Sequence, residues 1–399
     1  MRARLGFLFL NIGHFLDHLF MLVFATVAAL ALTREWGLDY AQLIPYATPG
    51  FVAFGAFALP AGWLADRWSR HGMMTIFFVG IGLSSTLTAL AETPLQIGLG
   101  LFAIGIFAAI YHPVGVALVL ERHDRAGMAV AVNGVFGNMG VAVAALLTGY
   151  LIDAAGWRSA FVWPGLAAIA LGIAYGLIMW RGAAPAAERR APAKPAPAPP
   201  FDRDRLIRVI VIVMATTALG GFVFQSTTFA LPRILAERAG DLAGSATLIG
   251  WLAFLAFAIG AVGQLIVGYA VDRVSPRTVF MVVAAMQLVF FAMMPGLEGW
   301  AAVVVSAAFM FASFSQLPIN DVLVGRVVKS AWRARVLAIR YTVTITVMAS
   351  ALPVIAWVYA GWGFDSLFVL LAVAGGLILS AVLLLPRAIP AAPVPAPAR

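Results

Sequence analysis

The feature of this sequence that most constrains its fold is a series of apolar runs, each long enough to cross a lipid bilayer, which takes about 20 residues. Charged residues, Pro or Gly bound twelve such runs, at residues 5–32, 43–65, 73–91, 95–120, 128–152, 157–180, 206–232, 246–271, 278–295, 299–324, 334–360 and 364–385. A bilayer core offers no water to exposed backbone groups, so each run must fold as a helix. The sequence therefore predicts an all-α integral membrane protein with twelve transmembrane helices.

The composition agrees with this class of protein. Hydrophobic residues make up 63% of the chain and charged residues 11%, whereas a soluble domain has about 25% charged residues. The first apolar run is too long for the h-region of a signal peptide, and no cleavage pattern follows it, so we expect it to be retained. Cysteine is absent, which excludes disulfides and thiolate metal sites.

A segment rich in Pro and Ala divides the twelve runs into two sets of six. It spans residues 181–205, carries scattered charges and cannot bury a core, so we predict a cytoplasmic, extended linker. This linker separates an N-terminal six-helix bundle at residues 1–180 from a C-terminal one at residues 206–385. The tail at residues 386–399 has the same composition, and we expect it to be disordered.

The two halves also resemble each other in sequence at a nearly constant offset, which indicates an internal repeat. Three short anchors carry the match: Gly62–Arg67 with Gly268–Arg273 at an offset of 206, His112-Pro113 with Leu317-Pro318 at 205, and Gly156 with Gly363 at 207. We therefore expect the two bundles to be pseudo-symmetric.

The basic residues predict the orientation in the membrane, because short cytoplasmic loops are enriched in Lys and Arg. With the N-terminus inside, 21 of the 26 basic residues fall on the cytoplasmic side. We expect a multi-pass protein of the bacterial inner membrane with both termini in the cytoplasm. The net charge of +9 then reflects topology and contact with anionic lipid headgroups, and nucleic acid is not an expected partner.

Three ionisable residues interrupt the first apolar run. Positions three, four and seven residues apart share one face of a helix. The face in question contains Asn11, His14, His18 and Met21, with Asp17 at its edge. Charged groups near the bilayer centre cost a few kcal/mol, so they face a bundle interior or a watery cavity and mark ion or solute paths. The alternative is a set of neutral, hydrogen-bonded residues that only pack helices together.

A further histidine lies in the fourth run, where His112 precedes Pro113. The proline frees a backbone carbonyl that a side chain or water must satisfy, so His112 has a possible role at a helix kink. If the first and fourth helices both face a central cavity, His112 converges there with His14, Asp17 and His18. Histidine can take up and release protons near neutral pH, and the sequence predicts a proton relay at this place.

The second half offers hydrogen-bonding side chains and one intramembrane cation. The solute-binding candidates among them are Gln225, Gln316, Arg340 and Tyr341. Arg340 either extends to the headgroups, neutralises Asp17 across the cavity, or binds an anionic group of the solute. We expect Asp321 to pair with Arg326 or Lys329 near the cytoplasmic end of its helix.

The loop after the second run, Gly62–Arg70, resembles the signature loop of the major facilitator superfamily, and a weaker copy runs from Gly268 to Arg277. The resemblance covers the whole chain, since twelve spans, a central linker and the copied loop are typical of that superfamily. It implies a latch that holds the bundle closed towards the cytoplasm. The residues expected in this gate are Gly62, Asp66, Arg67, Arg70, Asp272 and Arg273.

Within the superfamily, the sequence is similar to the fosmidomycin-resistance-like branch of bacterial exporters. Its Asn-x-x-His-Phe-x-x-Asp pattern is matched by Asn11, His14, Phe15 and Asp17. Its Phe-His-Pro-Glu-Gly pattern is matched by Tyr111, His112, Pro113 and Gly115, with Val114 in place of the acid. Its Gly-Asn-Leu-Gly pattern is matched by Gly137-Asn138-Met139-Gly140, which makes Asn138 a site candidate.

No nucleotide-binding loop, nucleophile elbow or His-Glu-x-x-His helix occurs in the sequence, so neither an ATP-driven pump nor an enzyme is expected, and no cofactor is implied. A metal site is the main alternative to the proton relay, because two histidines four residues apart on a helix have the spacing of metal ligands. The candidate ligands are His14, Asp17, His18, Met21 and His112.

These observations together predict a secondary active transporter that works by alternating access about a cavity at the midplane of the membrane. We expect proton-coupled export of an amphipathic organic compound, an antiport, by a monomer surrounded by membrane lipids. One alternative is transport of a transition metal, copper or iron, or of a metal chelate. The other is a transport-inactive membrane sensor or scaffold.

Overall fold

The computed structural model of the chain describes residues 2–121, 126–180, 203–328 and 330–386, and the elements in this part are helices. Eleven of these helical segments are long and apolar enough to cross a membrane. One of them, within α16 (Ser330–Leu383), contains two of the predicted spans, because the backbone leaves the helical conformation at Gly363, where φ is 72°. Glycine adopts this conformation without the steric cost that a Cβ would add. The structure therefore agrees with the prediction of twelve transmembrane helices.

The first half supplies six spans in chain order. They are built from α1 (Arg2–Val27), η1 (Ala28–Leu32) and α2 (Thr33–Glu35); α3 (Tyr40–Leu43), η2 (Ile44–Ala47), α4 (Thr48–Ala56) and α5 (Ala58–Arg67); α6 (Arg70–Thr88); α7 (Pro94–Ala108), η3 (Tyr111–Gly115) and α8 (Val116–Glu121); α9 (Ala126–Ala155); and α10 (Trp157–Trp180).

The second half repeats this plan. Its elements are α11 (Arg203–Arg238), η4 (Gly240–Ala243), α12 (Ala246–Val271), α13 (Pro276–Met293), α14 (Gly299–Ser315), α15 (Leu317–Val327) and α16. Helix α11 begins three residues before the predicted boundary at residue 206. The rest of the predicted linker, residues 181–202, and all but the first residue of the predicted tail lie outside the described residues.

Several helices begin at residues whose side chains cap them. The hydroxyl oxygens of Ser69, Thr93 and Ser245 accept hydrogen bonds from backbone N–H groups at the starts of α6, α7 and α12. Such caps satisfy N–H groups that have no partner inside the helix. The short connections between spans are thus fixed by local chemistry at the helix ends.

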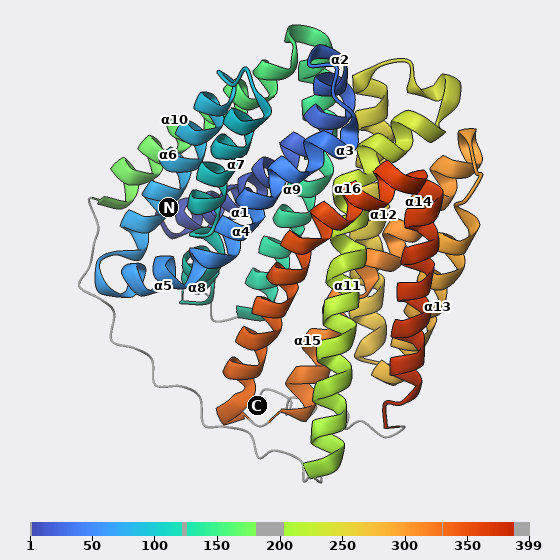
Figure 1. The fold of residues 1–399 in the computed structure, drawn as a ribbon. Coiled ribbons are helices and arrows are strands. Elements are labelled where there is room, and N and C mark those ends of the chain that lie inside the picture. Colours follow the sequence, from blue (N-terminus) through green and yellow to red (C-terminus); the bar gives the residue numbers. More distant parts are fainter. Residues whose placement is uncertain (1, 122–125, 181–202, 329, 387–399) are drawn as a thin grey trace.

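The two halves form adjacent bundles, with α1 to α10 coloured blue to green and α11 to α16 coloured yellow-green to red in Figure 1. In the first half α1 packs against α9 and α6 against α10; in the second, α11 and α13 pack against α16. Helices α9 and α12 pack against each other across the boundary between the halves.

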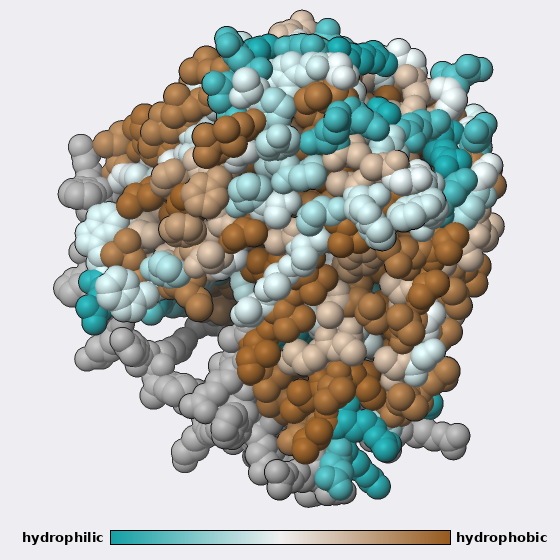
Figure 2. Space-filling model, viewed as in Figure 1, coloured by the Kyte–Doolittle hydropathy of each residue, from teal (hydrophilic) through white to brown (hydrophobic). Residues whose placement is uncertain are grey.

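Large apolar side chains are exposed on the outside of the bundles, among them Leu59, which is 82% exposed, and Trp357, which is 66% exposed. Figure 2 shows hydrophobic residues along the flanks of the visible face and hydrophilic residues gathered mainly towards its top and bottom. Water would make such a surface costly, whereas lipid tails would not. The distribution fits a protein whose flanks face a membrane.

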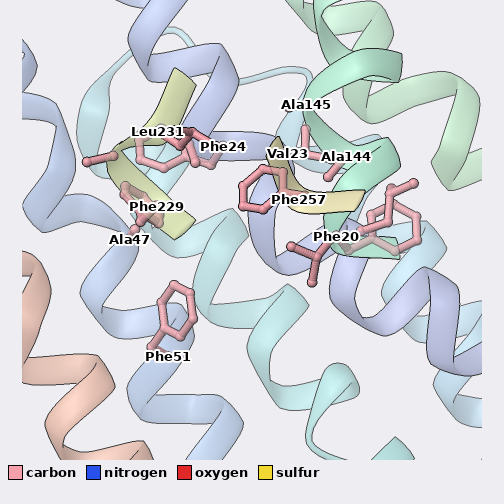
Figure 3. Close-up of a cluster of buried hydrophobic side chains, with 14 of the residues drawn as sticks. Phe20, Val23, Phe24, Ala47, Phe51, Ala144, Ala145, Phe229, Leu231 and Phe257 are labelled. Atoms are coloured by element: carbon pink, nitrogen blue, oxygen red, sulfur yellow. The ribbon is translucent and has the colours of Figure 1, made fainter. Parts of the chain in front are cut away.

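A buried aromatic cluster joins the two halves, as Figure 3 shows. The ring of Phe229 in α11 lies with its centroid 6.4 Å from that of Phe24 in α1 and 6.2 Å from that of Phe51 in α4. Phe20, Val23, Leu231 and Phe257 belong to the same buried core. Apolar packing therefore ties the first, second, seventh and eighth spans together.

The two ends of the molecule differ in how the halves meet. We call the end at which α5, α8, α10, α12 and α15 stop the linker end, and the opposite end the far end. At the far end the Tyr40 hydroxyl donates to the Phe229 carbonyl across the halves at 3.4 Å, and Arg233 donates to the Ala29 carbonyl at 3.4 Å. The Asp153 carboxylate of α9 accepts from the backbone N–H groups of Ala246 and Thr247 in α12.

At the linker end, the described ion pairs stay within one half. Arg70 pairs with Asp66 and Glu121 in the first half, and Arg326 lies 3.6 Å from Asp272 in the second. Figure 1 shows α5 and α8 lying apart from α15 at this end. The hydrogen bonds across the far end therefore hold the halves in a state in which the far end is closed.

Candidate functional site

The two histidines of the first span touch each other, one helical turn apart on α1. The Nε2 atoms of His14 and His18 lie 3.2 Å apart. His14 also places Nδ1 2.8 Å from the backbone carbonyl of Asn133 in α9. A carbonyl only accepts, so Nδ1 of His14 carries the hydrogen and its Nε2 is left as the acceptor that faces His18.

The fourth span delivers His112 to the same place. Nε2 of His112 lies 3.3 Å from Oδ2 of Asp17. The α-helix stops at Ala108 and the chain forms the π-helical turn η3 around Pro113, a local break of the kind that Pro causes and that often occurs at functional sites. The convergence of His14, Asp17, His18 and His112 from the first and fourth helices is confirmed, whereas the proton-relay role remains a prediction.

Asp17 has an unusual environment for a carboxyl group. Asp17 is fully buried, and neither of its carboxylate oxygens has a hydrogen-bond partner among the described residues, although Oδ2 lies 3.3 Å from Nε2 of His112. A buried charge without full pairing is costly, so such a group is retained for a purpose more often than for stability. His112 is the neighbouring group that can share or exchange a proton with it.

The three imidazoles also satisfy the elementary geometry of a metal-binding group. Each offers one ring nitrogen, and these nitrogens lie within 4.8 Å of one another. The other two ligands of the metal alternative are placed differently: Asp17 faces His112, and Met21 borders a small apolar hollow with Phe20. The residues able to hold a metal in the described part of this site are therefore the three histidines.

Asn133 of α9 organises the site, although the sequence analysis missed it. Its side-chain nitrogen donates to Asn11 Oδ1 at 2.9 Å and lies 2.9 Å from the Tyr111 hydroxyl, which donates to the Leu10 carbonyl at 2.7 Å. The Tyr111 ring stacks on His14, with centroids 4.9 Å apart. Asn133 could have been found in the sequence as a polar residue inside the fifth apolar run. It lies five positions before Asn138, which the family resemblance made a site candidate.

Two glycines of α9 allow this close approach to α1. A Cβ on Gly137 would lie 2.7 Å from Nε2 of His14, and a Cβ on Gly140 would collide with the backbone of Phe15. Small residues of this kind let membrane helices approach closely. The Gly137-Asn138-Met139-Gly140 pattern thus has a structural reason beside its resemblance to a family pattern.

The second half contributes Tyr341, whose ring centroid lies 6.2 Å from that of His112 across the boundary between the halves. Tyr341 is 37% exposed and the His112 side chain 26% exposed, so small molecules can reach this place. Arg340, the neighbour of Tyr341, forms an ion pair with Asp321 of α15.

The prediction that Asp321 pairs with Arg326 is therefore wrong, and the alternative partner, Lys329, cannot be compared with the structure. Arg326 faces Asp272 and the Val271 carbonyl, and Lys329 lies outside the described residues. Arg340 on the next span, 19 positions later in the sequence, is the basic residue that pairs with Asp321. Of the alternatives for Arg340, neutralising Asp17 is not what the structure shows, since its carboxylate partner is Asp321.

The remaining solute-binding candidates lie in three different settings. Asn138 donates to Gln264 Oε1 in α12 at 2.8 Å, across the halves. Gln316 bridges helices of the second half, because it donates to the Thr216 carbonyl and accepts from Gln287, both at 2.9 Å. Gln225 is buried, and its side-chain nitrogen has no hydrogen-bond partner among the described residues.

The expected gate residues sit at the linker end of each half. Asp66 accepts from Arg70 at 2.6 Å, and Arg70 also pairs with Glu121 at the end of α8. Gly62 faces Pro113 of η3, and the Arg67 guanidinium lies 4.7 Å from the Trp63 ring centroid.

The second half has a related arrangement. Asp272 faces Arg326, and the Arg273 guanidinium lies 3.4 Å from the Tyr269 ring centroid. Glu121 and Arg326 are 205 positions apart, close to the repeat offset. Each loop is thus tied to the end of the helix that carries a break at Pro113 or Pro318.

Both the sequence and the fold of this chain match those of known proteins. The chain matches the sequence model described as Major Facilitator Superfamily over residues 10–240 and 234–399. The fold resembles that of a bacterial homologue of the human lysosomal transporter Spinster, solved in an inward-facing, unoccupied conformation. That likeness has a TM-score of 0.70 at 13% sequence identity and covers 96% of this chain and 95% of that one.

Relatives of this chain in sequence are matched over only part of their length. A gallate transporter of Pseudomonas putida is 27% identical over 292 residues, which cover 65% of this chain and 63% of the relative. A 4-hydroxybenzoate transporter of Pseudomonas aeruginosa is 25% identical over 63% of this chain and 62% of its own length. A puromycin resistance protein of Streptomyces alboniger is 30% identical over 33% of this chain and 27% of its own length. The matches thus span less than two thirds of these relatives.

Proposed function

Because this chain belongs to the major facilitator superfamily, a family of transporters and not of enzymes, we propose that it is a secondary active transporter that couples the movement of a small organic solute to the movement of protons. The first candidates for the solute are aromatic carboxylates. The cluster of His14, Asp17, His18 and His112 carries the protons, and the solute binds beside it, between the halves.

One observation carries the proposal, namely a carboxyl group buried in a membrane span with a histidine as its ionisable neighbour. Asp17 is fully buried, and one of its oxygens lies 3.3 Å from His112 Nε2. A group that exchanges protons must lose and regain a charge during the cycle, and a partner that can hold the proton lowers the cost of each step. Residues that served only to pack helices would have no need for this pair of ionisable groups.

Alternating access is supported by the unequal contacts at the two ends. The halves are hydrogen-bonded to each other at the far end through Tyr40, Arg233 and Asp153. The ion pairs of Asp66, Arg70 and Glu121 at the linker end stay within the first half. Rocking of one half against the other would break the far-end contacts and bring the linker ends together, which is the motion expected of repeat-built transporters.

The solute class is supported by the relatives and by the side chains near His112. Gallate and 4-hydroxybenzoate, which name two of the relatives, each combine an aromatic ring with a carboxylate. The rings of Phe54, Tyr111 and Tyr341 have centroids within 6.2 Å of the His112 centroid. Aromatic side chains stack on an aromatic solute, and a protonated imidazole attracts its carboxylate. Such a solute is amphipathic, as the sequence led us to expect.

The direction of transport follows from the resemblance to fosmidomycin-resistance exporters and remains a prediction. Export by antiport moves the solute towards the acidic compartment, whereas symport moves it towards the alkaline one. The bacterial inner membrane, the cytoplasmic termini and the monomeric state are part of the same proposal.

The test uses purified protein in liposomes, with radiolabelled gallate and 4-hydroxybenzoate as probes and a pH gradient of either sign. We expect solute to accumulate against its gradient only when the pH gradient is present, in wild type and in a His71→Gln control. His71 lies outside the cluster and bonds to Tyr175. Accumulation should be lost in Asp17→Asn. Equal transport with and without the gradient, or in Asp17→Asn, would contradict the proposal.

The same assay separates the two alternatives from the sequence analysis. Flux of copper or iron salts without flux of any organic probe would favour metal transport. Binding of a probe without flux under any gradient would favour a sensor or scaffold.

A further inference from the structure

The three histidines of the candidate site are close to the spacing that a metal ion imposes. Bonds of about 2.0–2.1 Å from imidazole nitrogen to Zn²⁺, in tetrahedral geometry, put ligand nitrogens about 3.3 Å apart. The Nε2 atoms of His14 and His18 are already 3.2 Å apart. One ring nitrogen of each histidine lies within 4.8 Å of those of the other two, so shortening these separations by at most about 1.5 Å brings all three to the spacing of ligands.

One hydrogen bond and one nearby carboxylate suit two of the rings to this role. A metal-binding histidine almost always donates its second ring N–H to a backbone carbonyl or a carboxylate, which fixes the tautomer and orients the ring. His14 does so through Nδ1, which donates to the Asn133 carbonyl at 2.8 Å. His112 places Nε2 3.3 Å from the Asp17 carboxylate. His14 therefore has a supporting hydrogen bond and keeps Nε2 for a ligand bond, and a carboxylate that can support His112 lies beside that ring.

The site is also reachable and chemically selective. His18 and His112 are only partly buried, whereas His14 and Asp17 are buried. Three imidazoles with an exposed side leave a coordination position for water or a solute. Imidazole suits zinc, copper, nickel and iron, while Mg²⁺ and Ca²⁺ need oxygen ligands. No thiolate competes, because the chain has no cysteine.

We infer that His14, His18 and His112 bind one divalent first-row transition-metal ion of the Zn²⁺ class, and that the bound ion blocks the transport cycle. The ion takes the nitrogens that would otherwise carry protons and occupies the space beside Tyr341. The block of transport rests on the proposed function, whereas the binding of metal does not.

The first experiment measures Zn²⁺ binding by equilibrium dialysis on purified protein without a histidine tag. We expect one Zn²⁺ per chain in wild type and in His71→Gln, and no binding of Mg²⁺. His18→Ala removes a ligand and should weaken Zn²⁺ binding at least about 10-fold, and Asp17→Asn, which alters the support of His112, about 10- to 100-fold. Folding of each variant is checked by its thermal unfolding midpoint.

A second measurement needs no variant and keeps the inference testable if a substitution prevents folding. Co²⁺ bound to wild-type protein through imidazoles should give visible absorption bands that Zn²⁺ abolishes by displacement. Absence of these bands, or Zn²⁺ binding of wild-type strength in folded His18→Ala and His14→Ala variants, would overturn the inference.

The transport consequence is measured separately from binding. Stoichiometric Zn²⁺ should reduce probe flux in wild type and leave the residual exchange of His18→Ala unchanged. If Zn²⁺ binds as described but no organic probe is transported in any condition, the proposed function fails while the metal site stands. If probes are transported but Zn²⁺ does not bind, the metal site fails alone.

Discussion

Asp153 joins the two halves at the far end, so a substitution there tests whether that end opens, as the proposed alternating access requires. Its carboxylate, on α9 of the first half, accepts from Ala246 N at 3.3 Å and from Thr247 N at 2.7 Å in α12 of the second half. The Thr247 hydroxyl donates to the same carboxylate at 2.6 Å. Ser245 caps the next N–H of α12. Asp153→Ala removes a cap that one half supplies to a helix of the other, and it does so only while the far end is closed.

The size of the effect follows from the exposure of this carboxylate. Hydrogen bonds to charged groups contribute about 1.5–3 kcal/mol when buried, but Asp153 is exposed, so screening reduces that figure. The loss of an N-cap costs typically about 1 kcal/mol. We therefore expect Asp153→Ala to destabilise the far-end-closed state by about 1 kcal/mol, which raises the ratio of open to closed molecules about fivefold.

The distance between two spin labels reports this ratio. Because the chain has no native cysteine, labels attach only at cysteines that are introduced. Glu92→Cys in the first half and Glu298→Cys in the second place one label on each side of the far end, at exposed positions. Pulsed electron–electron double resonance should show a population with a longer distance between the labels, and its ratio to the shorter-distance population should rise about fivefold in the Asp153→Ala background.

The matched control is Glu35→Ala. Glu35 is also exposed, and its ion pair with Arg158 lies inside the first half. This change should leave the distance distribution as in wild type. The reasoning is refuted if Asp153→Ala leaves the open population unchanged, or if Glu35→Ala raises it equally.

Three further substitutions test other parts of the account. Gly137→Ala places a methyl group 2.7 Å from His14 Nε2 and should reduce gradient-driven transport at least about tenfold through overpacking. In the control Gly134→Ala the added methyl group meets open space, and transport should not fall. Equal effects of the two substitutions in a transport assay would count against the placement of His14. Asn133→Leu removes the side-chain donor to Asn11 and one of the hydrogen-bond partners of the Tyr111 hydroxyl, which keeps its bond to the Leu10 carbonyl. It should destabilise the protein by about 1–3 kcal/mol, seen as a lower thermal unfolding midpoint. An unchanged midpoint would show that the bonds are dispensable. Asp66→Ala should slow turnover with little loss of solute affinity, because Asp66 holds Arg70 at the linker end. Flux measures turnover and probe binding measures affinity. Equal losses in both would disprove a gating role.

The helices could be predicted from the sequence because hydropathy and length act locally. Twelve apolar runs correspond to the helical spans, and the main deviation in boundary is the end of α11 at Arg238 instead of residue 232. The meeting of His14, Asp17, His18 and His112 was also predictable on the condition that the first and fourth helices face one cavity, since three of the four lie within five positions of α1.

Other parts of the site depend on contacts between distant segments. Asn133 bonds to Asn11 across 122 positions in the sequence, and only the depth at which α9 packs on α1 determines that they meet. Asp321 selects Arg340 over the nearer Arg326 for the same reason. Polar residues inside apolar runs were visible in the sequence, but their pairing depends on the vertical register of helices, which hydropathy does not specify.

The central claim is that Asp17 and the histidines couple protons to solute, and proton movement itself tests it most directly. A pH-sensitive dye is enclosed in liposomes that contain the purified protein, and a gradient of gallate or 4-hydroxybenzoate is imposed without a pH gradient. The account predicts that the solute gradient drives proton movement in wild type and that Asp17→Asn, although it still binds the probe, moves none above protein-free liposomes. Solute flux in wild type without proton movement, or proton movement at the wild-type rate in Asp17→Asn, would contradict it.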